Sequence, residues 1–171
     1  MMISALAASI AILCFIAALT WAGWMDLYTM TIRNEVILFL VAVYAALAPL
    51  AGLGLAEISW NAVAALTVFA VMFLFFCFGW IGGGDAKLAS VVALWIGTNH
   101  VLDFLVYTAL FGGALTLIIV QFRTVVLPRQ YRGRSWIARL HATSSGVPYG
   151  VAIAAGALFV FPRTAWVTAL F

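Results

Sequence analysis

The sequence has few charged residues: they make up 8% of it, while 67% is hydrophobic and the mean hydropathy is +1.21. A soluble domain contains about 25% charged residues, and about half of its residues are apolar. So few polar side chains could not cover a core of this size with a hydrated surface. The composition therefore excludes a soluble globular protein and indicates an integral membrane protein.

Cysteine is also scarce, and Cys14 and Cys77 both lie inside apolar runs, where a buried small side chain is their expected role. No CxxC pair and no Cys/His spacing typical of zinc ligands occurs. The two histidines, His100 and His141, are expected at opposite membrane faces. The sequence therefore predicts neither a metal site nor a cofactor.

Basic residues are few but unevenly placed, since five of the eight lie between Arg123 and Arg139. A pI of 9.2 might suggest nucleic-acid binding, but a local bias of this kind in a membrane protein reports orientation instead. We therefore expect the basic segment to contact membrane lipids and not to bind nucleic acid.

Uncharged runs predict six transmembrane helices: a crossing needs about 20 apolar residues, which five of the runs supply, while the fourth is marginal in length. Open sheet edges cannot face lipid, so the expected fold is all-α, a bundle of six helices forming one membrane-embedded domain over residues 1–171 without a soluble domain. The runs are Ile3–Trp24, Val36–Leu55, Ile58–Gly84, Leu88–Leu102, Phe104–Phe122 and Ala142–Phe161.

Six crossings place both termini on one side and three connecting segments, Met25–Glu35, Gly82–Lys87 and Arg123–His141, on the other. Seven basic residues fall on the second side and one, Arg163, on the first, so the positive-inside rule makes the second side cytoplasmic. Both termini are then expected outside, with the first run retained as a helix. The seven are Arg33, Lys87, Arg123, Arg129, Arg132, Arg134 and Arg139.

Two of the five acidic residues, Asp26 and Asp85, each follow a full apolar run at its cytoplasmic end. Alternation brings them to the same depth on the same side, where an ionisable group is costly and points to function. Two carboxylates held close cannot both ionise cheaply, so one keeps a proton while the other acts as a base. The alternative for each residue is a simple helix flank, or an ion pair between Asp85 and Lys87.

Three glycines precede Asp85. Gly82, Gly83 and Gly84 lower helix propensity and permit positive φ and close backbone approach. We interpret them as a loosened segment that lets an extended substrate backbone lie beside Asp85. Close helix packing by small residues is the alternative.

Three separated blocks carry a resemblance. "GGGDAKL" at 82–88 contains the GxGD motif of intramembrane aspartyl proteases and resembles the type IV prepilin peptidases. "DLYTMTIRN" at 26–34 is similar to the stretch around that family's first catalytic aspartate, and "VPYGVAIAAGAL" at 147–158 resembles its last helix block. The short chain without a cysteine-bearing cytoplasmic insert is most similar to the CpaA/TadV group of Flp/Tad pilus systems.

The resemblance implies a membrane aspartic endopeptidase of the bacterial inner membrane, without a cofactor, acting at the cytoplasmic face. Its substrates would be prepilins and pseudopilins of the Flp type, from which it removes a short basic leader. Asp26 and Asp85 would be the catalytic pair. Arg33 stands where the family is expected to have proline, and the missing insert leaves N-methylation open.

Two further polar residues each have a structural and a functional interpretation. Lys87 is expected either to anchor at the interface or to tune Asp85, and Asn34 to cap the second helix or bond near Asp26. Gly146, Gly150 and Ala154 recur every four residues, which predicts a closely packed helix face.

Other function classes compete with the peptidase. A non-enzymatic membrane scaffold of a pilus or secretion system would use the aspartates only as helix flanks. A proton-coupled transporter would place its ionisable groups near the bilayer midplane, unlike this chain. A presenilin-type protease would need tyrosine before its first aspartate, where this chain has Met25.

Overall fold

The computed structural model describes residues 2–126 and 134–170, and every regular element within these ranges is helical. The all-α prediction is therefore confirmed, while two basic residues of the predicted cytoplasmic segment, Arg129 and Arg132, lie outside the described ranges. The elements are α1 (Met2–Thr29), α2 (Asn34–Leu50), α3 (Leu55–Cys77), α4 (Gly83–Ile96), α5 (Val101–Thr124), α6 (Ser135–His141), α7 (Tyr149–Val160), η2 (Phe161–Arg163) and α8 (Ala165–Thr168).

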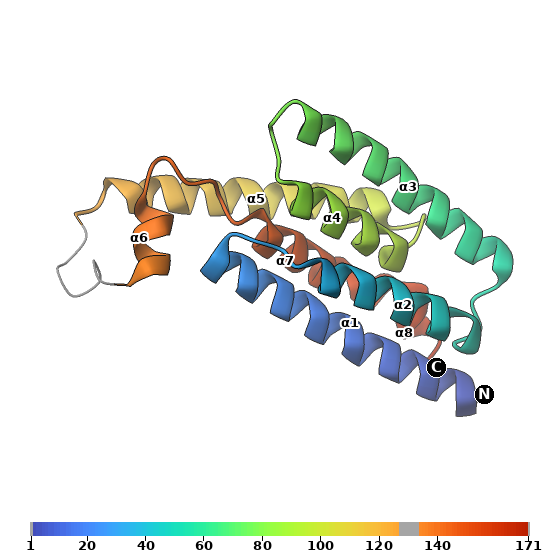
Figure 1. Ribbon diagram of the computed structural model, residues 1–171. Helices are drawn as coiled ribbons and strands as arrows, with labels where there is room; N and C mark the ends of the chain where they lie inside the picture. Colours follow the sequence, from blue (N-terminus) through green and yellow to red (C-terminus); the bar gives the residue numbers. More distant parts are fainter. Residues whose placement is uncertain (1, 127–133, 171) are drawn as a thin grey trace.

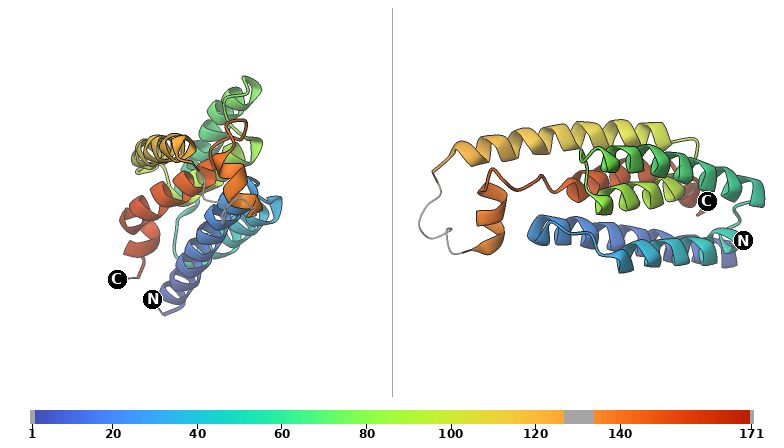
Figure 2. Two further views of the ribbon diagram at one scale, coloured as in Figure 1. Left: turned by 90° about the vertical axis from the view of Figure 1, so that its left-hand side faces the viewer. Right: turned by 45° about the horizontal axis from the view of Figure 1, so that its top comes forward.

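The longer helices run back and forth between two ends of an elongated bundle (Figures 1 and 2). Both chain termini lie at one end, which we call the terminal end. At the other end α1 finishes, α4 begins, and α6 lies beside the last turns of α5; we call it the aspartate end. Helix α7 lies inside the bundle and contacts α1, α4 and α5.

Local sequence explains where two of the long helices stop. Gly52 and Gly79 have φ of +95° and +74°, which side chains with a Cβ rarely adopt. After α3, the N–H of Gly79 bonds to the carbonyl of Phe76 at 2.9 Å and that of Trp80 to Phe75 at 3.0 Å. These two hydrogen bonds form the Schellman motif, which satisfies the last carbonyls of a helix. Helix α3 therefore ends before the glycines of the GxGD block.

Buried aromatic rings hold the terminal half of the bundle together. Phe15 of α1 stacks on Trp95 of α4 with ring centroids 4.8 Å apart, and Trp95 stacks on Trp166 of α8 at 4.8 Å. The indole N–H of Trp95 donates to the Leu40 carbonyl at 3.1 Å, so no buried polar atom of this ring is left unpaired. The stack fixes α4 against α1 and α2.

Small residues let α7 approach its neighbours closely. A Cβ built on Gly23 of α1 would lie 3.4 Å from the Cβ of Ala154, and one built on Gly156 would press on the backbone of Thr108 in α5 at 2.8 Å. The closely packed face that the small-residue repeat predicted is confirmed for Gly150 and Ala154, which contact α1. It is wrong for Gly146, which precedes α7 and whose Cβ would have no neighbour within 4 Å.

Within residues 2–126 and 134–170, three helices, α1, α3 and α5, are long and apolar enough to cross a membrane, whereas α2 and the segment Tyr149–Arg163 are shorter apolar helices. At 1.5 Å per residue, the 14 residues of α4 extend only about 21 Å, less than the roughly 30 Å of a hydrocarbon core. The chain has the helices of a membrane protein. Six separate crossings stay a prediction.

Several predicted boundaries were wrong. The third run was expected to continue to Gly84 and the fourth to begin at Leu88, but α3 ends at Cys77 and α4 begins at Gly83. The sixth was expected over Ala142–Phe161. Residues 142–148 are instead not helical, and α7 begins only after its N-cap Pro148, which disfavours a helical conformation in Val147. Helix α6 was not anticipated at all.

We predict that Gly156→Ala lowers the melting temperature, because the new methyl group meets the backbone of Thr108. Overpacking of this kind costs about 1–3 kcal/mol. Gly113→Ala in α5 is the matched control, since its Cβ would have no neighbour within 4 Å. Thermal unfolding of both purified variants in one detergent gives the comparison. Equal melting temperatures for the two would contradict the close α5–α7 contact.

Candidate active site

Asp26 lies in the last turn of α1 and is buried, with 4% of its surface exposed. A buried carboxylate needs hydrogen-bond donors in place of the water it has lost. One donor is the backbone N–H of Gly150, which lies 2.7 Å from Oδ2 of Asp26. The bond joins residues 124 positions apart in the sequence.

Gly150 is the second residue of α7, so its N–H is one of the helix-terminal donors that have no partner within the helix. A helix N-terminus also carries a partial positive charge that stabilises an anion. A Cβ at this position would lie 2.8 Å from Oδ2 of Asp26 and 3.0 Å from its Cβ. Glycine at position 150 therefore allows the approach that the bond requires.

Asp85 lies in the first turn of α4, outside the three helices long enough to span a membrane, and is half-buried. Burial and, to a smaller extent, the negative charge of Asp26 raise its pKa to about 7, although a hydrogen bond from the Gly82 backbone N–H acts in the opposite direction. Gly82 is the N-cap of α4, so the carboxylate at the third helical position reaches back to the cap.

The two aspartates line one cavity of about 430 Å³ at the aspartate end. Asp26 reaches it from α1 and Asp85 from α4. The remaining wall comes from three segments: the turn after α1, the glycines and the chain before α7. These residues are Met30, Thr31, Ile32, Gly82, Gly83, Gly84, Gly146 and Val147.

The glycines line this cavity but are not loosened as expected. None of the three has positive φ, and Gly83 and Gly84 already belong to α4. Their benefit is close approach: a Cβ on Gly84 would lie 3.1 Å from Ile32, and one on Gly83 would lie 3.2 Å from the Phe76 ring. Only Gly82 lies outside the helix, and there a Cβ would come within 3.0 Å of Oδ2 of Asp85.

Lys87 and Asn34 do not line the cavity. The ammonium group of Lys87 donates to Oδ1 of Asn34 at 3.1 Å, which joins α4 to α2 at the exposed surface. The expected capping role of Asn34 is wrong, because Arg33 is the N-cap of α2 and no side chain caps that helix. Arg33 forms an exposed ion pair with Glu35 at 3.1 Å and faces neither aspartate through any described bond.

Sequence reasoning missed the wall before α7. It treated Gly146 and Gly150 as packing residues and assigned nothing to Val147 beyond membership in a resembling block. The signal was the VPYG sequence itself, because proline is favoured at a helix start, where the first N–H groups have no partner within the helix, and glycine permits close approach to them. No spacing rule connects that block with Asp26.

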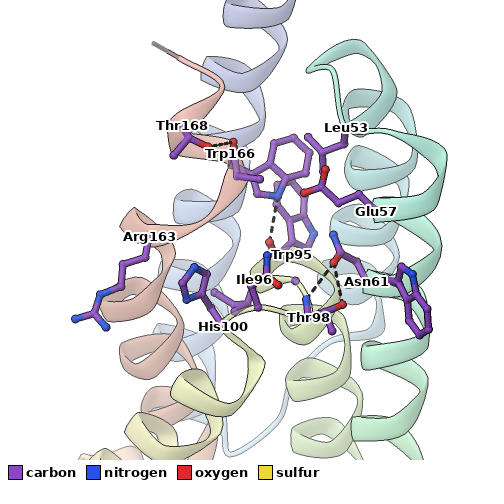
Figure 3. Close-up of a pocket in the computed structure, with 14 residues that line it drawn as sticks. Leu53, Glu57, Asn61, Trp95, Ile96, Thr98, His100, Arg163, Trp166 and Thr168 are labelled. Carbon is purple, nitrogen blue, oxygen red and sulfur yellow. Dashed lines mark hydrogen bonds between the residues drawn. The ribbon is translucent and has the colours of Figure 1, made fainter.

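A second cavity of about 550 Å³ lies at the terminal end, between the start of α3, the α4–α5 turn and α8 (Figure 3). Asn61 holds its wall together: its amide oxygen accepts the Thr98 N–H at 3.1 Å, and its nitrogen donates to the Tyr44 hydroxyl at 3.1 Å. Among the described lining residues Glu57 is the single carboxylate. This cavity offers no pair of acids, unlike the one at the aspartate end.

The aspartate pair can perform acid–base chemistry on one bound molecule. Since the pKa of Asp85 is raised to about 7, the pair can hold a single proton near neutral pH. A carboxylate then takes a proton from water while a carboxylic acid donates one to the atom under attack. Hydrolysis of an amide needs both actions together.

Comparison with known proteins finds one family match for the chain. Residues 13–117 match the type IV leader peptidase family. The match contains both aspartates and all three glycines and ends before α6. No curated protein and no solved structure matches the chain significantly.

We predict that Asp26→Asn moves the protonation midpoint of Asp85 to lower pH, because it removes the negative charge that helps to raise that pKa. The carboxyl C=O infrared band of isotope-labelled protein, titrated with pH, measures the midpoint. Loss of the band in Asp85→Asn assigns it. An unchanged midpoint in Asp26→Asn would mean that the two carboxyl groups do not interact.

Proposed function

Because the chain belongs to the type IV leader peptidase family, we propose that it is a membrane aspartic endopeptidase whose catalytic pair is Asp26 and Asp85. Membership in the family implies a protease, and prepilin-type proteins in general as substrates. The proposal adds the reaction type, the two residues and the bond cleaved, which joins the basic leader to the mature prepilin or pseudopilin.

The observation that supports the proposal is the shared cavity at the aspartate end. Two carboxylates from α1 and α4 line it together, and each has a backbone N–H donor at the start of a helix: Gly150 for Asp26 and Gly82 for Asp85. Helix flanks placed only for topology would have no need of burial or of dedicated donors. The arrangement therefore favours catalysis over the scaffold hypothesis.

The different environments suggest separate roles for the two acids. Asp26, hydrogen-bonded to a helix N-terminus, is the carboxylate that removes a proton from the attacking water. Asp85 retains a proton near neutral pH and donates it to the carbonyl oxygen as the new C–O bond forms. This step gives a tetrahedral diol.

Collapse of the diol completes the reaction. Asp26 returns its proton to the leaving nitrogen as the C–N bond breaks, and Asp85 recovers a proton from a diol hydroxyl as the carbonyl reforms. Neither a covalent intermediate nor a cofactor takes part, and the pair ends in its starting protonation state.

The proposed setting is the bacterial inner membrane, with six crossings and the aspartate end in the cytoplasm. Basic side chains support this orientation, because Arg33, Lys87, Arg123 and Arg139 lie at the aspartate end, whereas Arg163 lies at the terminal end. Both termini would then be periplasmic. Flp-type pilins and a place in the CpaA/TadV group belong to the same proposal.

We predict that Asp26→Asn and Asp85→Asn each reduce leader cleavage by a factor of about 10²–10⁴, the usual contribution of a positioned acid or base. Co-expression with a candidate prepilin and the size shift on a gel measure cleavage. Asp103→Asn, at the terminal end beside Arg163, is the matched control and keeps activity. Normal cleavage by both site variants would refute the dyad and favour the scaffold hypothesis.

We further predict that Gly150→Ala lowers kcat by about 10–100-fold, because its methyl group displaces the carboxylate of Asp26. Gly146 lines the same cavity, but a Cβ there would have no neighbour within 4 Å. Gly146→Ala is therefore expected to lower kcat less. Steady-state kinetics on both reconstituted variants test the difference. Equal kcat values would show that the Gly150–Asp26 contact does not matter for catalysis.

A further inference from the structure

Arg123, in the last turn of α5, is half-buried and makes an unusual number of hydrogen bonds for a residue expected only to set membrane orientation. Its Nε donates to the Leu140 carbonyl at 2.9 Å. Its Nη2 donates to the carbonyls of Ser145 and Gly146, each at 2.9 Å, and to Oγ of Ser145 at 3.2 Å. The guanidinium thus holds both ends of the turn between α6 and α7.

This turn leads directly to the donor for Asp26. Gly146 and Val147 line the dyad cavity, the buried Pro148 is the N-cap of α7, and Gly150 follows two residues later. Because these residues are consecutive and proline restricts the chain, a shift at Gly146 is transmitted to the first turn of α7. The position of the Gly150 N–H therefore depends on the carbonyls that Arg123 binds.

The other side of α6 is attached to α1. Arg139 donates to the Tyr28 carbonyl at 3.2 Å, and the rings of Tyr28 and Trp136 lie 4.9 Å apart. Tyr28 is two residues beyond Asp26. Residues 135–148 therefore form a bracket, with one contact near Asp26 and another, through Arg123, before Gly150; Figure 1 shows α6 at this end of the bundle.

We propose that Arg123 is a positioning residue of the active site, which closes the bracket so that the Gly150 N–H meets the carboxylate of Asp26. The inference rests on the proposed function for its effect on catalysis, but its structural part stands independently of any substrate. A basic residue whose only role was to set the membrane orientation would need only its positive charge. Positioning needs the planar fork of arginine, which binds several carbonyls at fixed angles.

Arg123→Lys tests the inference because it keeps the positive charge and therefore the membrane orientation. A lysine ammonium cannot reproduce the fork, so kcat for prepilin cleavage is expected to fall about 10–100-fold, with a smaller change in KM. Arg134→Lys is the matched control: it makes the same change at an exposed residue of the same end and leaves both constants as in the wild type.

Hydrogen exchange measures the structural part without substrate. In Arg123→Lys, the amides of residues 146, 147 and 149–151 are expected to exchange faster, while those of α2 keep the wild-type rate. Unchanged exchange together with wild-type kcat would overturn the inference. So would faster exchange throughout the protein with normal kcat per folded molecule, because Arg123 would then serve stability alone.

A double-mutant cycle separates this inference from the proposed function. In the Gly150→Ala background, Arg123→Lys is expected to add little further loss, because both changes act on one hydrogen bond. Fully additive losses of kcat would contradict the inference that both substitutions act on the Gly150–Asp26 hydrogen bond. If wild-type protein cleaves no prepilin, the proposed function fails, and the local exchange result alone supports or overturns the link between Arg123 and Gly150.

Discussion

A buried carboxylate inside a bundle of apolar helices must find a partner within the protein, and for Asp26 that partner is the backbone N–H of Gly150. The rest of the aspartate end is arranged around this 2.7 Å bond. It requires α7 to begin beside the last turn of α1, which the small residues Gly23 and Ala154 permit by letting the two helices touch. It also requires residue 150 to have no side chain.

The second carboxylate, that of Asp85, is held by a local contact within its own helix start. Asp85 reaches the N–H of Gly82, three residues before it, so its position follows from the start of α4 alone. One acid is thus fixed by its own helix and the other by a distant one. The cavity between them depends on how α1, α4 and α7 pack, and the aromatic stack around Trp95 fixes α4 in that packing.

Helices α4 and α7 have fewer residues than α1, α3 and α5 and do not extend over the full length of the bundle. Cavities lie next to their ends. The cavity with the acid pair is located before the starts of α4 and α7, and the one around Asn61 is located after the end of α4. A membrane protein can expose irregular backbone where it lines such a cavity, because water or a bound molecule satisfies the polar groups there. The short helices therefore leave room for polar groups inside an apolar bundle.

Composition and pattern were enough to predict an all-helical membrane protein and the approximate positions of six helices, α1 to α5 and α7, because burial in lipid demands long apolar runs. They were also enough to select Asp26 and Asp85, since charge in such a sequence is rare and both residues follow apolar runs at the same end. Helix ends at Cys77 and Tyr149 were missed, because they depend on a positive φ at Gly79 and on the proline at 148 rather than on hydropathy. Only the tertiary structure could decide that Gly150 binds Asp26, that Arg123 holds the preceding turn, and that Lys87 binds Asn34. Each of these contacts joins residues far apart in the chain, and their geometry depends on helix packing, which no local sequence pattern encodes.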